Sequence, residues 1–400
     1  MKINKITVSL IAAGIIASPL AHATNGYFSH GYGMKAKGMA GVGIALPQDS
    51  LAAATNPAGI VMVGNRMDAG VDLFKPNRDA DITGLGNFSG NGDSSFLIPE
   101  FGYNKVINTD SAFGVAVYGN GGMNTKYKTL NAGTALTPLN MGTGDAGVDL
   151  SQLFIAPTYA MKLNPDNAVG VSLNFAYQRF KAEGLQNFGI TNPGYDSSTG
   201  WGVRIGWTGQ ISPAVSLGAT YQTKTKMGKF SKYAGLFAEQ GGFDIPANYG
   251  VGLAFKLDDS TTLAADIQAI QYSGIKSISN PITSPGAMGA TDGPGFGWKD
   301  MTVVKLGASH KYEGGVVVRA GFSTGKQPIP ETETFFNILA PGVVENHLTL
   351  GGTWTMANNG EVTVGYMHAF KKTVTGAGPA AGIDLNMSED SIGVAYGWKM

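Results

Sequence analysis

One short motif in this chain of 400 residues has the spacing of a catalytic nucleophile. Residues 321–325, GFSTG, match G-x-S-x-G, in which a sharp turn from a strand into a helix exposes the serine. Pro328 and Pro330 follow, and proline is incompatible with the helix that the motif requires. His347 falls on the inner face of a neighbouring predicted strand, where it could act as a base for Ser323. A serine hydrolase is therefore a minor alternative.

Metal and nucleotide chemistry have less support. The histidines after the leader are far apart and show no ligand spacing, and the chain has no cysteine. A glycine-rich run at residues 31–62 lacks both G-x-x-x-x-G-K-[ST] and G-x-G-x-x-G, and no strand precedes it. We therefore expect no metal and no cofactor.

That glycine-rich run predicts a compact, mostly apolar plug that needs walls around it. Asp49 or Ser50 can cap a short helix near residues 51–55, because either side chain accepts hydrogen bonds from the first turn. Asn56-Pro57 should end that helix, since proline disfavours helical geometry at the preceding residue.

Composition narrows the class of protein. The 28 basic and 28 acidic side chains cancel, so nothing favours a nucleic-acid partner. No internal stretch of about 18 apolar residues could form a transmembrane helix. Residues 1–23 combine Lys2 and Lys5, a short apolar run and Ala21-His22-Ala23, which is typical of a cleaved signal peptide.

From Arg66 to Met400 the side chains alternate between apolar and small or polar, the period of β-strands. Six tight turn signals alternate with seven longer loops, so thirteen connections join fourteen strands. The predicted loops include residues 76–93, 119–145 and 374–388. Short turns at one end, long loops at the other and an apolar outer face are typical of an outer-membrane barrel. A soluble β-sandwich also alternates, but its packed core needs more Leu and Ile than these glycine-lined polar faces offer.

Three features of the predicted barrel point to ligand handling. Four cationic side chains stand at strand positions that the alternation predicts to face the lumen: Arg204, Lys299, Lys305 and Arg319. They are ordinary lumen charges or anchors for an anionic head group. The loop at residues 230–243 carries an apolar cluster, exposed unless it packs or binds something: Phe230, Tyr233, Leu236, Phe237 and Phe243. The third strand is interrupted by glycines that mark a bulge or kink: Gly119, Asn120, Gly121 and Gly122.

Taken together, the plug ending in Asn56-Pro57-Ala58, the barrel length and the turn pattern resemble the FadL/OmpP1/TodX family of outer-membrane transporters for long-chain fatty acids and hydrocarbons. The resemblance implies an all-β fold, a 14-stranded antiparallel barrel at residues 66–400 with a mostly helical N-terminal hatch at residues 24–65 in its lumen.

The resemblance also implies a ligand route. It begins at an external groove, here the loop at residues 230–243, passes an interior pocket beside the hatch, and leaves sideways at the third-strand kink. We place Asn56, Pro57 and Ala58 nearest that exit. A basic pair meets the carboxylate in the family, and Arg179 and Lys299 occupy the similar places. Arg179 continues the outward face of its strand, so either a bulge reverses it or the role passes elsewhere.

The resulting hypothesis is passive uptake of long-chain fatty acids or similar hydrophobic compounds by a monomer in outer-membrane lipid, without enzymatic activity. The alternatives are an aromatic-hydrocarbon channel of the same family, a barrel-embedded lipase or esterase, and a structural porin or adhesin.

Overall fold

The computed structural model describes residues 25–128 and 141–400. The predicted signal peptide, residues 1–23, and part of the predicted loop at residues 119–145 lie outside the described residues. No helix in the described part of the chain has the length and hydropathy to cross a membrane.

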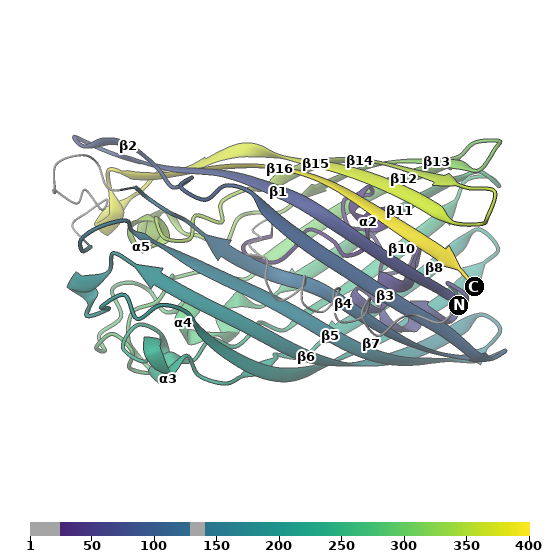
Figure 1. Ribbon diagram of the computed structural model, residues 1–400, viewed down its shortest axis with the longest axis horizontal. Helices are drawn as coiled ribbons and strands as arrows, with labels where there is room; N and C mark the ends of the chain where they lie inside the picture. Colours follow the sequence, from purple (N-terminus) through teal and green to yellow (C-terminus); the bar gives the residue numbers. More distant parts are fainter. Residues whose placement is uncertain (1–24, 129–140) are drawn as a thin grey trace.

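A single antiparallel sheet closes on itself, because the last strand pairs with the first. Figure 1 shows the resulting tilted barrel. Fourteen strands form its wall, which confirms the predicted number. They are β1 (Arg66–Ile82), β3 (Phe96–Asn108), β4 (Ser111–Asn124), β5 (Gly147–Asn164), β6 (Asn167–Glu183), β7 (Asp196–Ser212), β8 (Val215–Gln222), β10 (Asn248–Lys256), β11 (Thr261–Ile270), β12 (Met301–Lys311), β13 (Val316–Thr324), β14 (Asn346–Thr355), β15 (Glu361–Val374) and β16 (Ile383–Lys399).

Two short strands extend this wall: β2 (Gly86–Ser89) pairs with β1, and β9 (Lys226–Met227) pairs with β7. The predicted loops at residues 76–93 and 374–388 are partly wrong. β1 and β16 stay paired from Pro76 opposite Glu389 to Ile82 opposite Ile383. Tertiary pairing with β16 outweighs the turn signal of Pro76-Asn77, so the barrel wall continues further toward the long loops.

The long loops carry short helices. The α-helices are α3 (Ala238–Gly241), α4 (Lys276–Ser279) and α5 (Thr334–Asn337). The 3-10 helices are η3 (Gln186–Phe188), η4 (Ser231–Tyr233), η5 (Tyr272–Gly274), η6 (Glu331–Glu333) and η7 (Gly378–Ala380).

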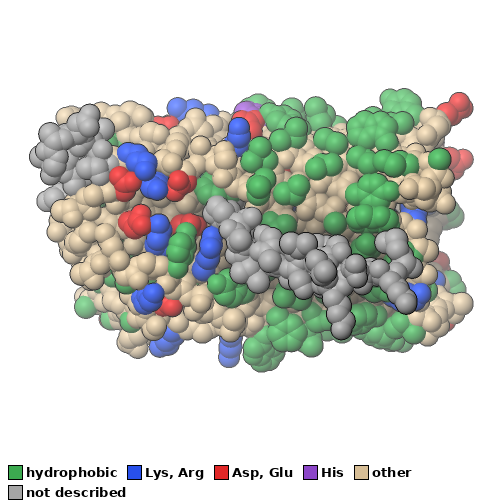
Figure 2. Space-filling view, viewed as in Figure 1, with side chains coloured by type: hydrophobic (Ala, Val, Ile, Leu, Met, Phe, Trp, Pro, Cys, Tyr) green, Lys and Arg blue, Asp and Glu red, His purple; other side chains and the backbone are tan. Residues whose placement is uncertain are grey.

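The two faces of the wall differ as the alternation predicts. In β6, Leu173, Phe175 and Tyr177 are exposed on the outside, whereas Asn174 and Gln178 are buried inside. Figure 2 shows hydrophobic side chains over the half of the barrel nearest the short turns, while most charged side chains gather toward the long loops. An apolar outer band and a polar interior are the pattern of a barrel in a membrane.

Residues 25–65, the plug, lie inside the barrel (Figure 1, purple). The expectation that this segment is mostly helical is not met. Its helices are α2 (Met34–Lys37), with four residues, and the 3-10 helices η1 (Ser50–Ala54) and η2 (Pro57–Val61), with five each. Bends and turns make up most of the remainder, because the glycines let the backbone follow the wall rather than form regular helix.

Candidate functional site

The plug fits the wall because the wall is glycine where the two touch. A Cβ on Gly206 of β7 would lie 1.9 Å from Oδ1 of Asn56, and one on Gly170 of β6 would lie 2.5 Å from the carbonyl carbon of Pro57. Asn56 also donates from Nδ2 to the backbone oxygens of Ile44, at 2.7 Å, and Trp207, at 2.9 Å. Glycine is thus required in the wall for close approach of the plug backbone.

Asp49 and Asn56 each cap a short helix. Asp49 accepts the N–H of Leu51 at 3.0 Å and begins η1. Asn56 accepts the N–H of Ala58 at 3.1 Å and begins η2, with Pro57 in its first turn. Asn56-Pro57 therefore starts a second helix besides following the first, because proline is favoured at the first helical position.

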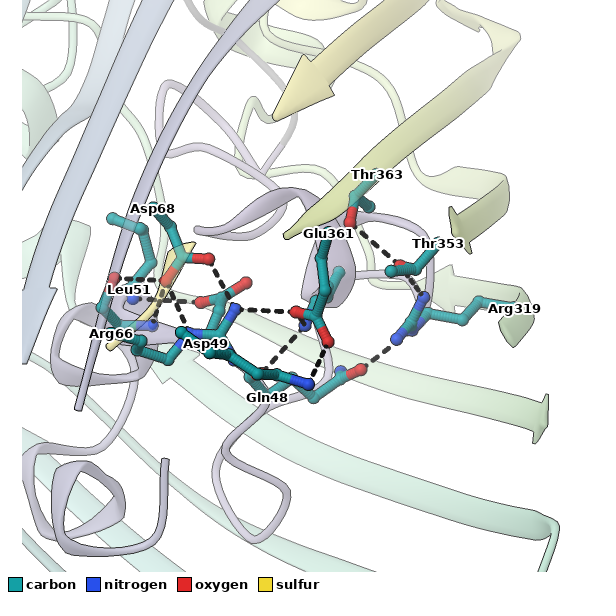
Figure 3. A network of polar contacts seen from close by, with 12 residues as sticks. Gln48, Asp49, Leu51, Arg66, Asp68, Arg319, Thr353, Glu361 and Thr363 are labelled. Atoms are coloured by element: carbon teal, nitrogen blue, oxygen red, sulfur yellow. Dashed lines mark hydrogen bonds and ion pairs between the residues drawn. The ribbon is translucent and has the colours of Figure 1, made fainter. Parts of the chain in front are cut away.

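Buried ion pairs join one side of the plug to the wall (Figure 3). Lys35 Nζ lies 2.6 Å from Glu361 of β15, and Arg66 of β1 lies 3.0 Å from the same carboxylate. Asp68 of β1 accepts the backbone N–H of Ser50 at 2.9 Å. We call these residues, with Lys37 and its partners, the ionic anchor.

Lys37 extends the ionic anchor to two more strands. Its Nζ lies 3.1 Å from Asp72 of β1 and 3.2 Å from Glu100 of β3. Although burial opposes its charged form, the two carboxylates raise the pKa of Lys37 above its usual range. Removing one partner of a buried pair costs about 3–5 kcal/mol. The ionic anchor therefore holds α2 firmly against β1, β3 and β15.

Near the ionic anchor, the surroundings of Asp49 disfavour its charged form. Burial, together with the neighbouring carboxylate of Asp68, raises the pKa of Asp49 to about 7. Its side chain caps η1, so the charge of this cap depends on pH near neutrality.

The opposite side of the plug, residues 25–32, is the arm, and it pairs with the interrupted strand β4. The register with β5 shifts between Gly119 and Gly121, so Asn120 forms a bulge where the glycines predicted an interruption. Ser29 donates its backbone N–H to the oxygen of Asn120 at 3.0 Å, and Gly122 donates to the oxygen of Tyr27 at 3.0 Å. Residues 27–29 therefore cover the bulge from inside. Asn56, Pro57 and Ala58 were expected to lie nearest this point; instead Asn56 packs against Gly206 of β7, and Pro57 and Ala58 pack against Gly170 of β6.

The predicted external groove is a closed cluster. Its five side chains, Phe230, Tyr233, Leu236, Phe237 and Phe243, are at most 4% exposed. Phe180, which points inward from β6, packs against them, with its ring centroid 4.7 Å from those of Tyr233 and Phe237. Of the two alternatives that the sequence left open, exposure and packing, the structure shows packing, because the loop folds over the mouth of the barrel. From there Phe243 reaches the arm at Tyr27, with ring centroids 6.2 Å apart.

The predicted cations divide into two groups. Arg204, Lys305 and Arg319 are buried in the lumen, as their parity predicts. Lys299 is exposed in the loop before β12. Arg179 lies on the outer face, where Nε donates to Ser151 Oγ at 3.1 Å and the guanidinium stacks 4.7 Å from the Tyr195 ring. The bulge that would turn Arg179 inward does not form, so Arg179 and Lys299 do not meet in a pocket.

Arg204 and Lys305 border a small internal cavity of about 20 Å³ beneath the arm. Asp266 on its wall accepts the N–H groups of Gly43 and Ile44, while its Oδ1 has no partner among the described residues. A cavity of this size holds about one water molecule. As it stands, the cavity has no room for a larger ligand.

Sequence reasoning missed four buried cations: Lys35, Lys37, Arg66 and Arg78. The two arginines have the inward parity of β1, so the alternation that selected Arg204 could have found them. The two lysines sit in the irregular plug, where no period applies.

Ser323 and His347 do come together. Ser323 Oγ lies 3.2 Å from His347 Nδ1, and both residues are 1% exposed. The serine stands in the regular strand β13, however, and not on a turn into a helix. Among residues 25–128 and 141–400, no three side chains of His, Asp or Glu are placed to hold a metal ion.

These observations define a class: a membrane barrel of fourteen strands with an N-terminal plug in its lumen. The family described as outer membrane protein transport protein (OMPP1/FadL/TodX) matches residues 16–398, and the chain belongs to this family. It is therefore an outer-membrane transport protein and not an enzyme.

Solved structures share the fold. The toluene transporter TodX of Pseudomonas putida is 18% identical, with a TM-score of 0.72 over 93% of this chain and 99% of that one. A FadL homologue of Pseudomonas aeruginosa is 14% identical, with a TM-score of 0.71 over 94% and 99%. The toluene transporter TbuX of Ralstonia pickettii is 19% identical, with a TM-score of 0.65 over 93% and 99%. No match is found among curated proteins.

Proposed function

We propose that the protein takes up long-chain fatty acids or similar hydrophobic compounds passively, and releases them sideways through the wall at the β4 bulge. The observation that carries this proposal is the contact between the arm and the bulge. Backbone hydrogen bonds that a wall strand would make to its neighbour are made here to residues 27–29 of the plug. Withdrawal of the arm would leave an irregular place in the wall uncovered.

The first step is entrance through the aromatic cluster at residues 230–243. Phe237 and Phe243 stack with centroids 4.8 Å apart, and Phe243 contacts Tyr27 of the arm. A ligand that inserts between these rings gains apolar contact and presses on the arm. Entrance of the ligand and displacement of the arm are thereby linked through one set of packed side chains.

The second step is retention of the plug while its arm moves. Buried ion pairs hold Lys35 and Lys37 of α2. The arm is held instead by hydrogen bonds and aromatic contacts: besides its two backbone bonds to β4, Tyr27 donates its N–H to the Tyr272 hydroxyl at 3.2 Å and Lys305 Nζ donates to the His30 oxygen at 2.9 Å. Because a buried ion pair costs more to break than any one of these hydrogen bonds, the arm moves and the body of the plug stays.

Sideways release is the energetically sensible outcome. Each CH₂ moved from water to an apolar setting gains about 0.8 kcal/mol. A long acyl chain that crossed a watery pore would lose this gain, whereas release into lipid keeps it.

Uptake tests the proposal directly. A host that lacks its own transporters of this family should accumulate labelled oleate, oleyl alcohol or toluene faster when it carries the wild-type protein. The same difference should remain in proteoliposomes without an energy source. Equal rates with and without the protein, when it is present and folded, would overturn the proposal.

An aromatic-hydrocarbon channel is the second candidate. It is favoured by the rings around the arm: Tyr27 lies 5.4 Å from Tyr272 and 6.0 Å from Trp298, centroid to centroid. Two of the similar structures are toluene transporters. Faster uptake of toluene than of oleate would select this candidate.

A further inference from the structure

We propose that the outer face of β5, β6 and β7 binds a phosphorylated glycolipid of the surrounding outer leaflet, with its phosphates on basic side chains and one acyl chain in a groove beside them. In an outer membrane, the lipid of this class is lipopolysaccharide, whose anchor carries two phosphates and several acyl chains. The inference goes beyond transport, because the site lies on the lipid side of the wall and not on the route through the lumen.

The outward side chains of β6 change from apolar to basic at one place. Phe175 and Tyr177 are 52% and 42% exposed, and the next two outward positions are Arg179 and Lys181. Figure 2 shows a similar change on the visible face of the barrel, where hydrophobic side chains give way to charged ones toward the long loops. Because the long loops of outer-membrane barrels are external, this border lies at the head groups of the outer leaflet.

An apolar groove lies beside these cations on the lipid side of the wall. It encloses about 450 Å³, and its apolar lining comes from outward positions on three strands: Leu153 and Ile155 of β5, Phe175 and Tyr177 of β6, and Trp201 of β7. Trp201, at 63%, is the most exposed large hydrophobic side chain among the described residues. The groove therefore has room for an acyl chain, and its indole and phenol rings are of the kind enriched at membrane interfaces.

Arg179 keeps hydrogen-bond donors available for a phosphate. Its Nε donates to Ser151 Oγ at 3.1 Å, and its guanidinium stacks 4.7 Å from the centroid of the Tyr195 ring. Among the described residues, no carboxylate forms an ion pair with Arg179 and no acceptor occupies its Nη groups. The two contacts thus orient a planar fork that matches the oxygens of a phosphate group.

Two lysines add to this basic surface. Lys181 pairs with Glu183 at 2.7 Å, and since an ammonium group has three donors, it can also bind a phosphate oxygen. Lys226 of β9 is exposed beside Trp201, its partner in the β7–β9 register, and forms no ion pair in the described part of the chain. Several cations around one groove fit a lipid with two phosphates better than a lipid with one.

Neutral hydroxyl groups lie among the cations. Ser197 and Thr199 of β7 stand opposite Arg179 and Tyr177 in the β6–β7 register, and both are exposed on the outer face. Hydroxyl groups donate and accept hydrogen bonds, so they suit a sugar and do not repel a phosphate. Groove, hydroxyls and cations together match the acyl chain, sugar and phosphates of one glycolipid.

The test is lipid binding to the purified full-length protein in mild detergent, measured by native mass spectrometry. The probes are rough-type lipopolysaccharide, the same lipid after removal of its phosphates, and phosphatidylglycerol. The wild-type protein should bind intact lipopolysaccharide at least about 10-fold more tightly than either of the others. Arg179→Gln and Lys226→Gln should each weaken binding of the intact lipid about 10-fold and leave the dephosphorylated lipid nearly unchanged, because only a charged contact is lost.

Lys105→Gln is the matched control. Lys105 also faces outward and is exposed, stands opposite the exposed ring of Phe113 and forms no ion pair among the described residues, but it lies at the short-turn end of β3. This variant should bind all three lipids as the wild-type protein does. Trp201→Ser, which removes one wall of the groove, should weaken the intact and dephosphorylated lipids alike.

Several results would overturn the inference. Unchanged lipopolysaccharide binding in both Arg179→Gln and Lys226→Gln would refute the phosphate contacts, and an equal loss in Lys105→Gln would show a nonspecific effect of charge. Equal affinity of the wild-type protein for phosphatidylglycerol and lipopolysaccharide would refute the glycolipid as the occupant. If Arg179→Gln does not fold, Lys226→Gln decides alone. Because none of these measurements involves uptake, each outcome leaves the transport proposal to its own test.

Discussion

Gly121→Ala should release the arm from the β4 bulge. A Cβ at this position would lie 2.1 Å from the backbone oxygen of Tyr27, whereas real Cβ contacts are essentially never shorter than 3.0 Å. The arm must therefore retreat by about 0.9 Å. Gly121 is not among the residues with positive φ, so Ala fits the backbone and the contact alone produces the effect.

The retreat breaks two backbone hydrogen bonds, from Ser29 to Asn120 and from Gly122 to Tyr27. At about 1 kcal/mol each, their loss totals about 2 kcal/mol. Since each 1.4 kcal/mol is a factor of ten, the open arm should be populated about 30-fold more.

Cysteine labelling measures this population, because the chain has no cysteine of its own. Ser29→Cys places a thiol at a residue that is only 7% exposed, and maleimide should react with it about 30-fold faster in the Gly121→Ala background. Gly274→Ala, whose Cβ would meet nothing within 4 Å, is the control. Equal labelling in the two backgrounds would refute the idea that the arm is held at the bulge by these contacts.

Three further predictions concern the plug and the mouth. Lys37→Met should lower the free energy of unfolding by about 3–5 kcal/mol, measured by denaturant titration. Lys276→Met, which removes an ion pair that is about half exposed, should change this free energy by less than about 1 kcal/mol. Similar losses in the two variants would contradict a buried ionic anchor. Because the pKa of Asp49 is raised to about 7, the folded state binds its proton more tightly than the unfolded state, so stability should fall as pH rises from about 4 to 7. Asp49→Asn should flatten that fall in thermal unfolding, and an unchanged pH profile would argue against it. Phe237→Ser should slow oleate uptake without changing the labelling of a thiol in the arm, and an unchanged rate would place the entrance elsewhere.

The sequence determined the class of fold and the family. Strict alternation in strands such as β6 needs only the local rule that successive side chains point to opposite faces, and that rule survives in any barrel. Counting turns and loops fixed the number of strands. The bulge at Asn120 was visible as well, because glycines interrupt an otherwise regular strand.

Contacts between distant segments could not be predicted in the same way. Parity gives the face of Arg204 or Arg179 but not the height or the neighbours of the side chain, so Lys299 was placed in the lumen and Arg78 was overlooked. Whether the aromatic loop is exposed or packed could not be decided from its sequence, which does not show that Phe180 of β6 lies beneath it.

The plug shows most clearly which features follow from the sequence and which depend on the tertiary structure. Its glycines indicated a segment that needs walls, since close backbone approach depends on residue type alone. Its ion pairs, its contact with the bulge and the short extent of its helices depend on which wall residues face it, and only closure of the barrel brings β1, β3, β4 and β15 around the same segment.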